Sequence, residues 1–309
     1  MQQARVEVKK DSFAKSFQKH WMLYLMVVPA LLYVIIFCYK PMYGILIAFK
    51  KFNYRDGIMG SPWIGFDNFR RIFSSYWFPI IFKNTLTLSF MGILFGFPLP
   101  IVFALLVNEI KNSRAKKIYQ TISYAPHFIS TVVVCGMILM FLSTEGVVNT
   151  FLDVLGLEAQ RVMQNPSAFK WVNFISGEWQ ELGWGSIIYL SALSNVDPQC
   201  TEAACIDGAN RFQRMIHINF PVLIPTISIM LILRFGQVMS LGYEKIYLLQ
   251  NSANLYGSEI ISTYVYKVGL EQGDFGFSTA VSLMNSLVNV ILLLTVNKIS
   301  AKVSNNSLF

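Results

Sequence analysis

Residues 197–225 read DPQCTEAACIDGANRFQRMIHINFPVLIP and carry the pattern of a short helix, a turn and a second short helix. Asp197-Pro198 predicts a helix start, because an aspartate side chain accepts hydrogen bonds from free backbone amides and proline suits the first helical position. Gly208 predicts the turn, since glycine tolerates backbone angles that a side chain resists. Pro221 then opens an apolar stretch. A polar helix-turn-helix held between two apolar stretches is suited to act as a rigid lever for a peripheral partner.

The composition of the whole chain is that of a membrane protein. Of its 309 residues, 54% are hydrophobic and 14% are charged, and the mean hydropathy is +0.48. Soluble domains carry roughly a quarter charged residues, so this chain has too little charge to cover a surface that faces water. Its apolar residues also gather in long runs, as membrane spans require. The sequence therefore predicts an all-α fold, a polytopic membrane helical bundle.

Six stretches are expected to cross the membrane, because a spanning helix needs roughly 20 predominantly apolar residues. A mixed stretch, residues 149–181, contains Pro166 and four acidic side chains, and we expect an external loop or a partly re-entrant segment there. The fourth expected span is short and rich in glycine and serine. The expected spans are residues 21–39, 84–108, 118–144, 182–196, 220–243 and 275–297.

The distribution of positive charge favours a topology with both termini in the cytoplasm, where loops are enriched in lysine and arginine. Residues 1–19 are expected to be a cytoplasmic segment, residues 20–300 the membrane domain and residues 301–309 a cytoplasmic tail. The run 21–39 has no clean cleavage site of small residues, so an uncleaved first helix is expected. The basic residues that support this orientation are Arg5, Lys9, Lys10, Lys15 and Lys19 before the first span, and Lys111, Arg114, Lys116 and Lys117 after the second.

Several classes of function lack their sequence signature. The formal net charge is +8, but the basic residues form no patch interleaved with aromatic residues, so nucleic acid is not an expected partner. We expect the basic residues to face membrane lipid instead. Four cysteines without a CxxC pair and only three histidines predict neither a disulfide framework nor a metal site. The chain contains no GxxxxGK[ST] and no HExxH. We expect no catalytic residues, no cofactor and no ATP hydrolysis in this chain.

The polar segment also matches a known motif. Glu202-Ala203-Ala204, then three residues, Gly208, nine residues, Ile218, one residue and Phe220-Pro221 resembles the EAA loop of binding-protein-dependent ABC permeases. That family usually has leucine before the proline, where this chain has Phe220. In the family the loop docks into a cleft on the ATPase subunit and transmits its closure to the membrane helices. The resemblance implies an ATPase-coupling loop at residues 197–221 formed by Glu202, Ala203, Ala204, Asp207, Gly208 and Phe212.

The resemblance extends beyond the loop. GWGSIIYLSAL from Gly183, SLGYEKIYLL from Ser240 and NKISAKVSNNSLF from Asn297 are similar to the polysaccharide and complex-carbohydrate branch of these permeases. This implies a type I importer in the bacterial cytoplasmic membrane, in which the chain pairs with a second, different permease. The other implied partners are two copies of an ABC ATPase, which would bind the ATP, and an extracellular or periplasmic solute-binding protein. The implied substrate is a carbohydrate.

Arg234 is the most informative residue of the expected spans. It follows Pro221 by 13 residues, which places it about 20 Å along a helix and deep in a bilayer core roughly 30 Å thick. It is either a tie to a neighbouring helix or partner permease, or a donor that lines the substrate pathway. Gln237 shares its face. The further pathway candidates are Asn285 and Asn289, for which interhelix hydrogen bonds are the alternative, and Trp184 and Tyr189, for which an interfacial aromatic belt is the alternative.

Three other functions stay open at this point. The coupling loop does not discriminate solutes, so the substrate could be a peptide or another polar solute. A membrane-embedded enzyme would need converging catalytic groups, and the spans hold no paired carboxylates and no His/Cys cluster. A secondary transporter is disfavoured by the coupling loop and by the lack of repeated halves.

Overall fold

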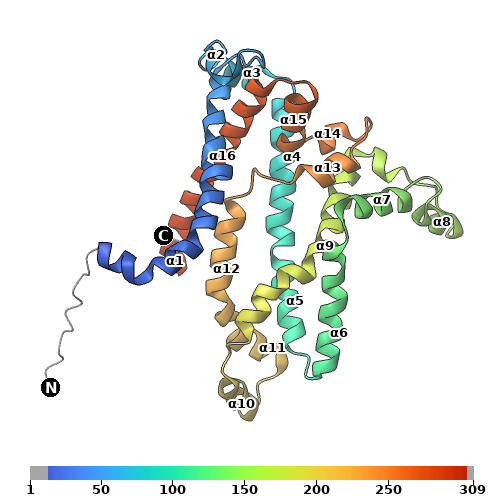
Figure 1. The fold of residues 1–309 in the computed structure, drawn as a ribbon. Helices are drawn as coiled ribbons and strands as arrows, with labels where there is room; N and C mark the ends of the chain where they lie inside the picture. The colour runs from blue at the N-terminus through green and yellow to red at the C-terminus, as the bar shows by residue number, and fades with distance from the viewer. Residues whose placement is uncertain (1–12, 305–309) are drawn as a thin grey trace.

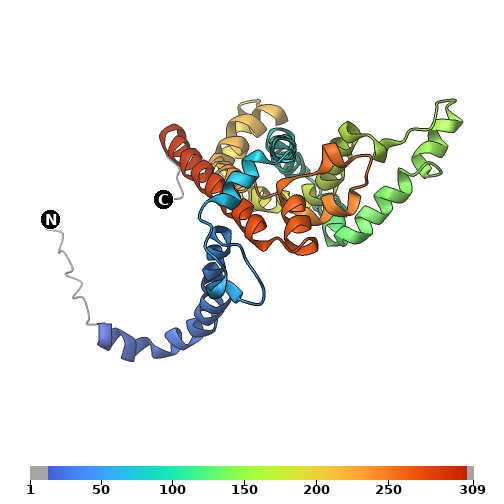
Figure 2. The same ribbon diagram turned by 90° about the horizontal axis from the view of Figure 1, so that it is seen from above.

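A computed structural model describes residues 13–304, and these fold into helices joined by short loops (Figures 1 and 2). The only β-structure within this range is an isolated antiparallel bridge between Lys50 and Trp63. The expected all-α fold class is therefore confirmed. The ends of the two expected cytoplasmic segments, residues 1–12 and 305–309, lie outside the described residues.

The described residues contain four helical stretches that are long and apolar enough to span a membrane: Lys19–Phe49, Phe78–Asn108, Arg211–Phe235 and Phe275–Lys302. A fifth results if the bent pair Ser113–Phe128 and Thr131–Phe141 is taken as one span. The expected count of about six is thus not confirmed by length and composition.

The first helix is longer than expected and stands away from the body (Figure 2). α1 (Phe13–Tyr33), η1 (Val34–Tyr39) and η2 (Lys40–Phe49) follow one another without a break. The chain continues as helix beyond residue 39, and Pro41 lies in the first turn of η2. After it, α2 (Gly57–Gly60) and α3 (Asp67–Ser74) form the end of the molecule drawn uppermost in Figure 1.

The second span contains a π-helical turn. α4 (Phe78–Met91), η3 (Gly92–Gly96) and α5 (Pro98–Asn108) form one continuous stretch that ends, as expected, at residue 108. Pro98 and Pro100 lack backbone donors, and the amide of Phe97 reaches back five residues to the carbonyl of Gly92 at 2.8 Å. This π-helical turn shifts the hydrogen-bond pattern by one residue, and it begins and ends with the two glycines Gly92 and Gly96.

The expected third span, residues 118–144, is not a straight helix. α6 (Ser113–Tyr124) with η4 (Ala125–Phe128) and α7 (Thr131–Phe141) meet at an angle of 94°. Pro126 lies in the short 3-10 segment, and Ser130 begins α7 by accepting a hydrogen bond from the amide of Val133. The proline in the 3-10 segment and the capping serine four residues later therefore mark the end of one helix and the start of another.

The expected external loop was wrong over its second half, because residues 166–181 belong to a 28-residue helix, α9 (Pro166–Leu193). Asn165 caps α9 by accepting hydrogen bonds from the amides of Ser167 and Ala168, and Pro166 occupies the first turn. Proline thus starts this helix and does not break it. The expected fourth span, 182–196, covers only the end of α9. α8 (Val147–Val154) and η5 (Val162–Gln164) precede it.

The coupling segment folds as expected. It comprises α10 (Pro198–Ile206), α11 (Arg211–Arg214) and η6 (Met215–Asn219), and it leads directly into α12. α12 (Phe220–Phe235) ends before the expected residue 243. The chain then continues through α13 (Tyr243–Leu249), α14 (Leu255–Ser258), α15 (Ile261–Tyr266) and η7 (Lys267–Glu271) to the last helix, α16 (Phe275–Ser304).

The buried core lies in separate clusters between these helices. One cluster, with Ala104, Tyr189 and Leu223, joins α5, α9 and α12. Another, with Ile72, Ile81 and Phe277, joins α3, α4 and α16. α10 and α11 lie at the end of the molecule opposite α2 and α3 (Figure 1). A cavity lies between the two ends, where α5, α9, α12 and α13 approach one another.

Candidate functional site

The coupling loop is built by local hydrogen bonds. The Asp197 side chain accepts from the amide of Gln199 at 2.9 Å and starts α10. Gly208 ends it with a φ of 82°, a left-handed angle that favours glycine. Asn210 and Gln213 then form a reciprocal capping box at 2.8 and 2.9 Å, which starts α11. The sequence signals of this loop therefore act where they were expected.

The residues expected to meet a peripheral partner lie on an exposed tip. Glu202, Ala203, Asp207 and Gly208 are exposed, and Ala204 is half-buried. The Phe212 side chain is 64% exposed, and Ile206, which the sequence reasoning did not single out, is 86% exposed. Exposed apolar side chains beside a carboxylate form a surface suited to a protein partner.

A half-buried ionic contact ties this loop to the second span. Glu109, directly after α5, lies 3.5 Å from the guanidinium of Arg214. It also accepts a hydrogen bond from the side-chain amide of Asn219 at 3.1 Å. Arg214 also donates to the carbonyl of Ala209 at 2.9 Å, so it holds both the turn and the span. Sequence reasoning missed Glu109, because 105 residues separate it from its ionic partner.

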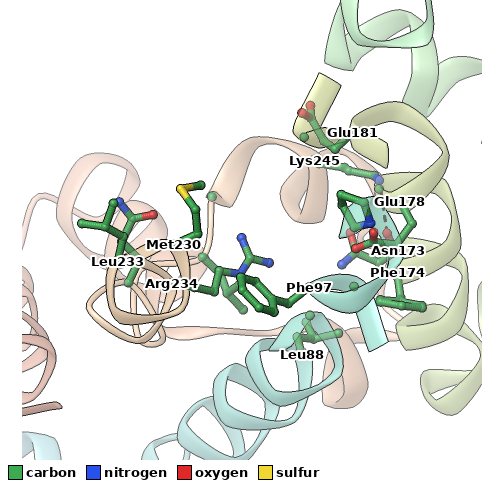
Figure 3. A pocket seen from close by; sticks show the side chains of 18 of the residues that line it. Leu88, Phe97, Asn173, Phe174, Glu178, Glu181, Met230, Leu233, Arg234 and Lys245 are labelled. Atoms are coloured by element: carbon green, nitrogen blue, oxygen red, sulfur yellow. Dashed lines mark hydrogen bonds between the residues drawn. The ribbon is translucent and has the colours of Figure 1, made fainter. Parts of the chain in front are cut away.

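The cavity has a volume of about 780 Å³ and opens between the π-helical turn η3, α5, α9, α12 and the segment that leads into α13 (Figure 3). Arg234 and Gln237, both expected in the pathway, line it and are exposed. Among the described residues, no hydrogen bond or salt bridge satisfies the Arg234 guanidinium. Its donors are therefore available to a solute or to water.

Three charged side chains in the cavity were not expected: Glu178, Glu181 and Lys245. Lys245 donates to the carbonyl of Asn173 at 3.1 Å, as Figure 3 shows by a dashed line. Glu181 lies 3.1 Å from Nδ1 of His127. A sequence signal could have located the two glutamates. Asn165-Pro166 is a helix start, and it places them on a helix and not in a loop.

The other expected pathway residues have separate positions. Tyr189 lines the cavity but is only 3% exposed, because it packs between α5 and α12. Trp184 does not line the cavity, and it stacks on His127 with the ring centroids 4.3 Å apart.

The two asparagines of α16 also lie outside the cavity. Asn289 accepts from the backbone amide of Met239 at 2.9 Å and donates to Ser240 at 2.7 Å, so it ties α16 to the segment that follows α12. Asn285 Oδ1 is buried and has no hydrogen-bond partner within residues 13–304.

This geometry offers a cavity within a helical bundle, with charged side chains in its lining, and an exposed helical loop at one end of the molecule. No group of three or more His, Cys, Asp or Glu within residues 13–304 could hold a metal ion. The comparison with known families agrees with a transport role: the family described as "Binding-protein-dependent transport system inner membrane component" matches residues 96–305. The chain belongs to this family. It is a permease component of an ABC transport system.

The permease has relatives of similar length. It is 40% identical to the protein LplB of Bacillus subtilis (strain 168), over 97% of this chain and 95% of that protein. It is 39% identical to the polygalacturonan/rhamnogalacturonan transport system permease protein YteP of the same organism, over 98% and 94%. A chain in the crystal structure of a bacterial alginate ABC transporter, in complex with an alginate pentasaccharide-bound periplasmic protein, superimposes with a TM-score of 0.88 at 37% identity, over 96% of this chain and all of that one.

Proposed function

We propose that this permease forms the translocation pathway for an oligo- or polysaccharide, in an importer completed by a second homologous permease, two ATPase copies and a solute-binding protein outside the cell. The observation that carries the proposal is the 780 Å³ cavity into which Arg234 and Gln237 turn free hydrogen-bonding groups. A saccharide presents many hydroxyl groups, and a planar guanidinium can donate to two of them at once.

The relatives support a carbohydrate over a peptide or another polar solute. YteP is named for the transport of polygalacturonan and rhamnogalacturonan, and the solved transporter for alginate. Each of these is a uronate-containing polymer. A carboxylate on the sugar would pair with the Arg234 guanidinium through two parallel hydrogen bonds. The structure of the alginate transporter holds a periplasmic binding protein, which supports such a partner for this chain.

The exposed loop with Glu202, Gly208 and Phe212 is the proposed contact with the ATPase. Glu202 would supply the polar contact, and Ala203 and Ala204 would permit close approach. ATP would be bound by the partner ATPases, so this chain needs no cofactor. The loop at residues 197–221 would then lie in the cytoplasm. Glu109 and Arg214 bring the basic residues 111–117 to the same end, which agrees with cytoplasmic termini and the positive-inside rule.

The pathway role of Arg234 is tested by two variants. Arg234→Lys keeps the charge and loses the planar fork, whereas Arg234→Ala loses both. We expect both variants to assemble with the partner permease and the ATPases, and to take up a labelled oligogalacturonate at least tenfold more slowly than the wild type. Arg161→Ala, in an exposed loop before α9, is the control and should transport normally.

The same experiment separates the alternatives. If Arg234→Ala fails to assemble with its partner permease, the residue is a structural tie and the pathway role is wrong. If wild-type cells take up a labelled tripeptide and no added saccharide competes with that uptake, the proposed substrate class is wrong.

A further inference from the structure

Two side chains of opposite charge face the cavity without a hydrogen-bond partner among the described residues. Arg234 extends from α12 and Glu178 from α9, and both line the cavity. No hydrogen bond or salt bridge within residues 13–304 engages either charged group. The remaining charges of the lining are engaged, Glu181 with His127 and Lys245 with a backbone carbonyl. Leaving a charge unpaired in a membrane protein is costly, which marks such groups as functional.

The same two side chains lie against one pair of glycines. A Cβ atom added to Gly92 would lie 2.8 Å from Nη2 of Arg234, and one added to Gly96 would lie 2.9 Å from Cδ of Glu178. The two glycines bound the π-helical turn η3, one turn apart on the same side of the span. Figure 3 shows Arg234 and Glu178 reaching into the cavity from different helices. The absence of two side chains on η3 therefore leaves room for both charged groups.

We propose that Glu178, held over Gly96, is the hydrogen-bond acceptor of the saccharide site whose donor is Arg234, held over Gly92; this rests on the proposed function. Sugar hydroxyls donate to the carboxylate and accept from the guanidinium, and hydrogen bonds to charged groups are the strong ones. With an acidic saccharide, the sugar carboxylate is attracted to Arg234 and repelled by Glu178. The pair therefore sets the direction in which an acidic chain enters the cavity.

Glu178→Gln tests the proposal in the assembled transporter. The substitution keeps the shape and removes the negative charge. We expect the uptake of a neutral labelled arabino-oligosaccharide and of a labelled oligogalacturonate to fall about tenfold, as the loss of a charge-assisted hydrogen bond predicts. Glu145→Gln changes an exposed carboxylate between α7 and α8 that does not line the cavity, and it should change uptake less than threefold. Equal uptake by Glu178→Gln and the wild type would overturn the proposal.

Gly96→Ala tests the same contact from the other side. The added methyl group meets only the far end of the Glu178 side chain, so it displaces the carboxylate and leaves the backbone in place. Gly136→Ala is the matched control, because its Cβ would meet nothing within 4 Å and this glycine does not line the cavity. We expect Gly96→Ala to match the loss in Glu178→Gln, and Gly136→Ala to transport normally. If Gly96→Ala transports normally although Glu178→Gln does not, the placement over the glycine is wrong.

The rival role for these charges is an ion pair between them when the cavity closes. A double-mutant cycle with Arg234→Gln and Glu178→Gln distinguishes the two roles. If each group contacts the saccharide separately, the two fold-losses multiply. If uptake by the double variant falls no further than uptake by the more impaired single variant, the two charges act as one pair and our assignment is overturned. A wild-type complex that transports neither saccharide would refute the proposed function, a result distinct from both.

Discussion

The coupling loop and the cavity differ in how the chain builds them. The loop is made by neighbours in sequence: Asp197, Gly208 and the Asn210–Gln213 capping box each act within a few residues. The cavity takes its charged groups from segments far apart, with Glu178 on α9, Arg234 on α12 and the glycines that accommodate them on η3. Under the proposed function, force transmission would depend on local backbone geometry, whereas solute contact would depend on tertiary packing. Variants in the two regions should therefore fail in different ways.

The largest effect is expected at the bend of the loop. Gly208→Val places a β-branched residue at a φ of 82°, which costs roughly 1–3 kcal/mol and favours a different turn. We expect saccharide-stimulated ATP hydrolysis by the assembled complex to be lost, while the chain still inserts and its cavity is unchanged. The measurement is phosphate release with and without the loaded binding protein.

Gly136→Val is the matched control for the bend. An added Cβ at Gly136 also meets nothing within 4 Å, but this glycine has no positive φ and lies in α7. Its ATP hydrolysis should stay within about twofold of the wild type, as expected for an exposed substitution without strain. If saccharide stimulates ATP hydrolysis in Gly208→Val as strongly as in the wild type, the bend at Gly208 is not needed for coupling.

The sequence predicted the loop better than the cavity for a physical reason. Caps and turns are written in adjacent residues, so Asp197-Pro198 and Gly208 could be interpreted without knowing the rest of the fold. Arg234 was found because depth in a bilayer follows from counting residues along one helix. The loop predicted around Pro166 left Glu178 outside the predicted pathway, although Asn165-Pro166 carries the same helix-start signal as Asp197-Pro198. Applying that signal consistently would have predicted α9, but not that Glu178 lies over Gly96.

The membrane spans show the same limit. Apolar length located the second and last spans well, yet it gave no sign that α6 and α7 meet at 94°. It also gave no sign that Asn289 bonds the backbone of Met239, a contact across 50 residues. Such contacts depend on which helices become neighbours, and one sequence does not specify that through local pattern alone.

An intermediate effect is expected where the two regions meet. Glu109 ties the loop to α5, and α5 lines the cavity through Pro100. Glu109→Gln keeps the shape and loses the ionic contact with Arg214. We expect saccharide-stimulated ATP hydrolysis to fall several-fold, up to about tenfold, with basal hydrolysis and assembly retained. Stimulated and basal phosphate release from the same preparation measure this.

Glu145→Gln is the control for Glu109, because Glu145 is exposed between α7 and α8. It should behave as the wild type. If Glu109→Gln does so too, movement of the loop reaches the cavity through α12 alone, and the separation of the two regions is sharper than the contact suggests.

The smallest effect is expected at the asparagines of α16, which the sequence left open between solute contact and helix ties. Asn289→Ala leaves the Met239 amide and Ser240 without their partner. Interhelix hydrogen bonds in membranes contribute about 1 kcal/mol, so the assembled complex should unfold at a slightly lower temperature while its uptake of saccharide per folded complex stays the same. Asn285→Ala, one helical turn away, removes an oxygen that is buried without a partner, and it should cost less stability than Asn289→Ala or none. Thermal unfolding of the purified complex, followed beside uptake in proteoliposomes, checks both variants. A large loss of uptake in Asn289→Ala without a change in melting would place this residue in the solute pathway, and the cavity would then reach further toward α16 than its lining residues indicate.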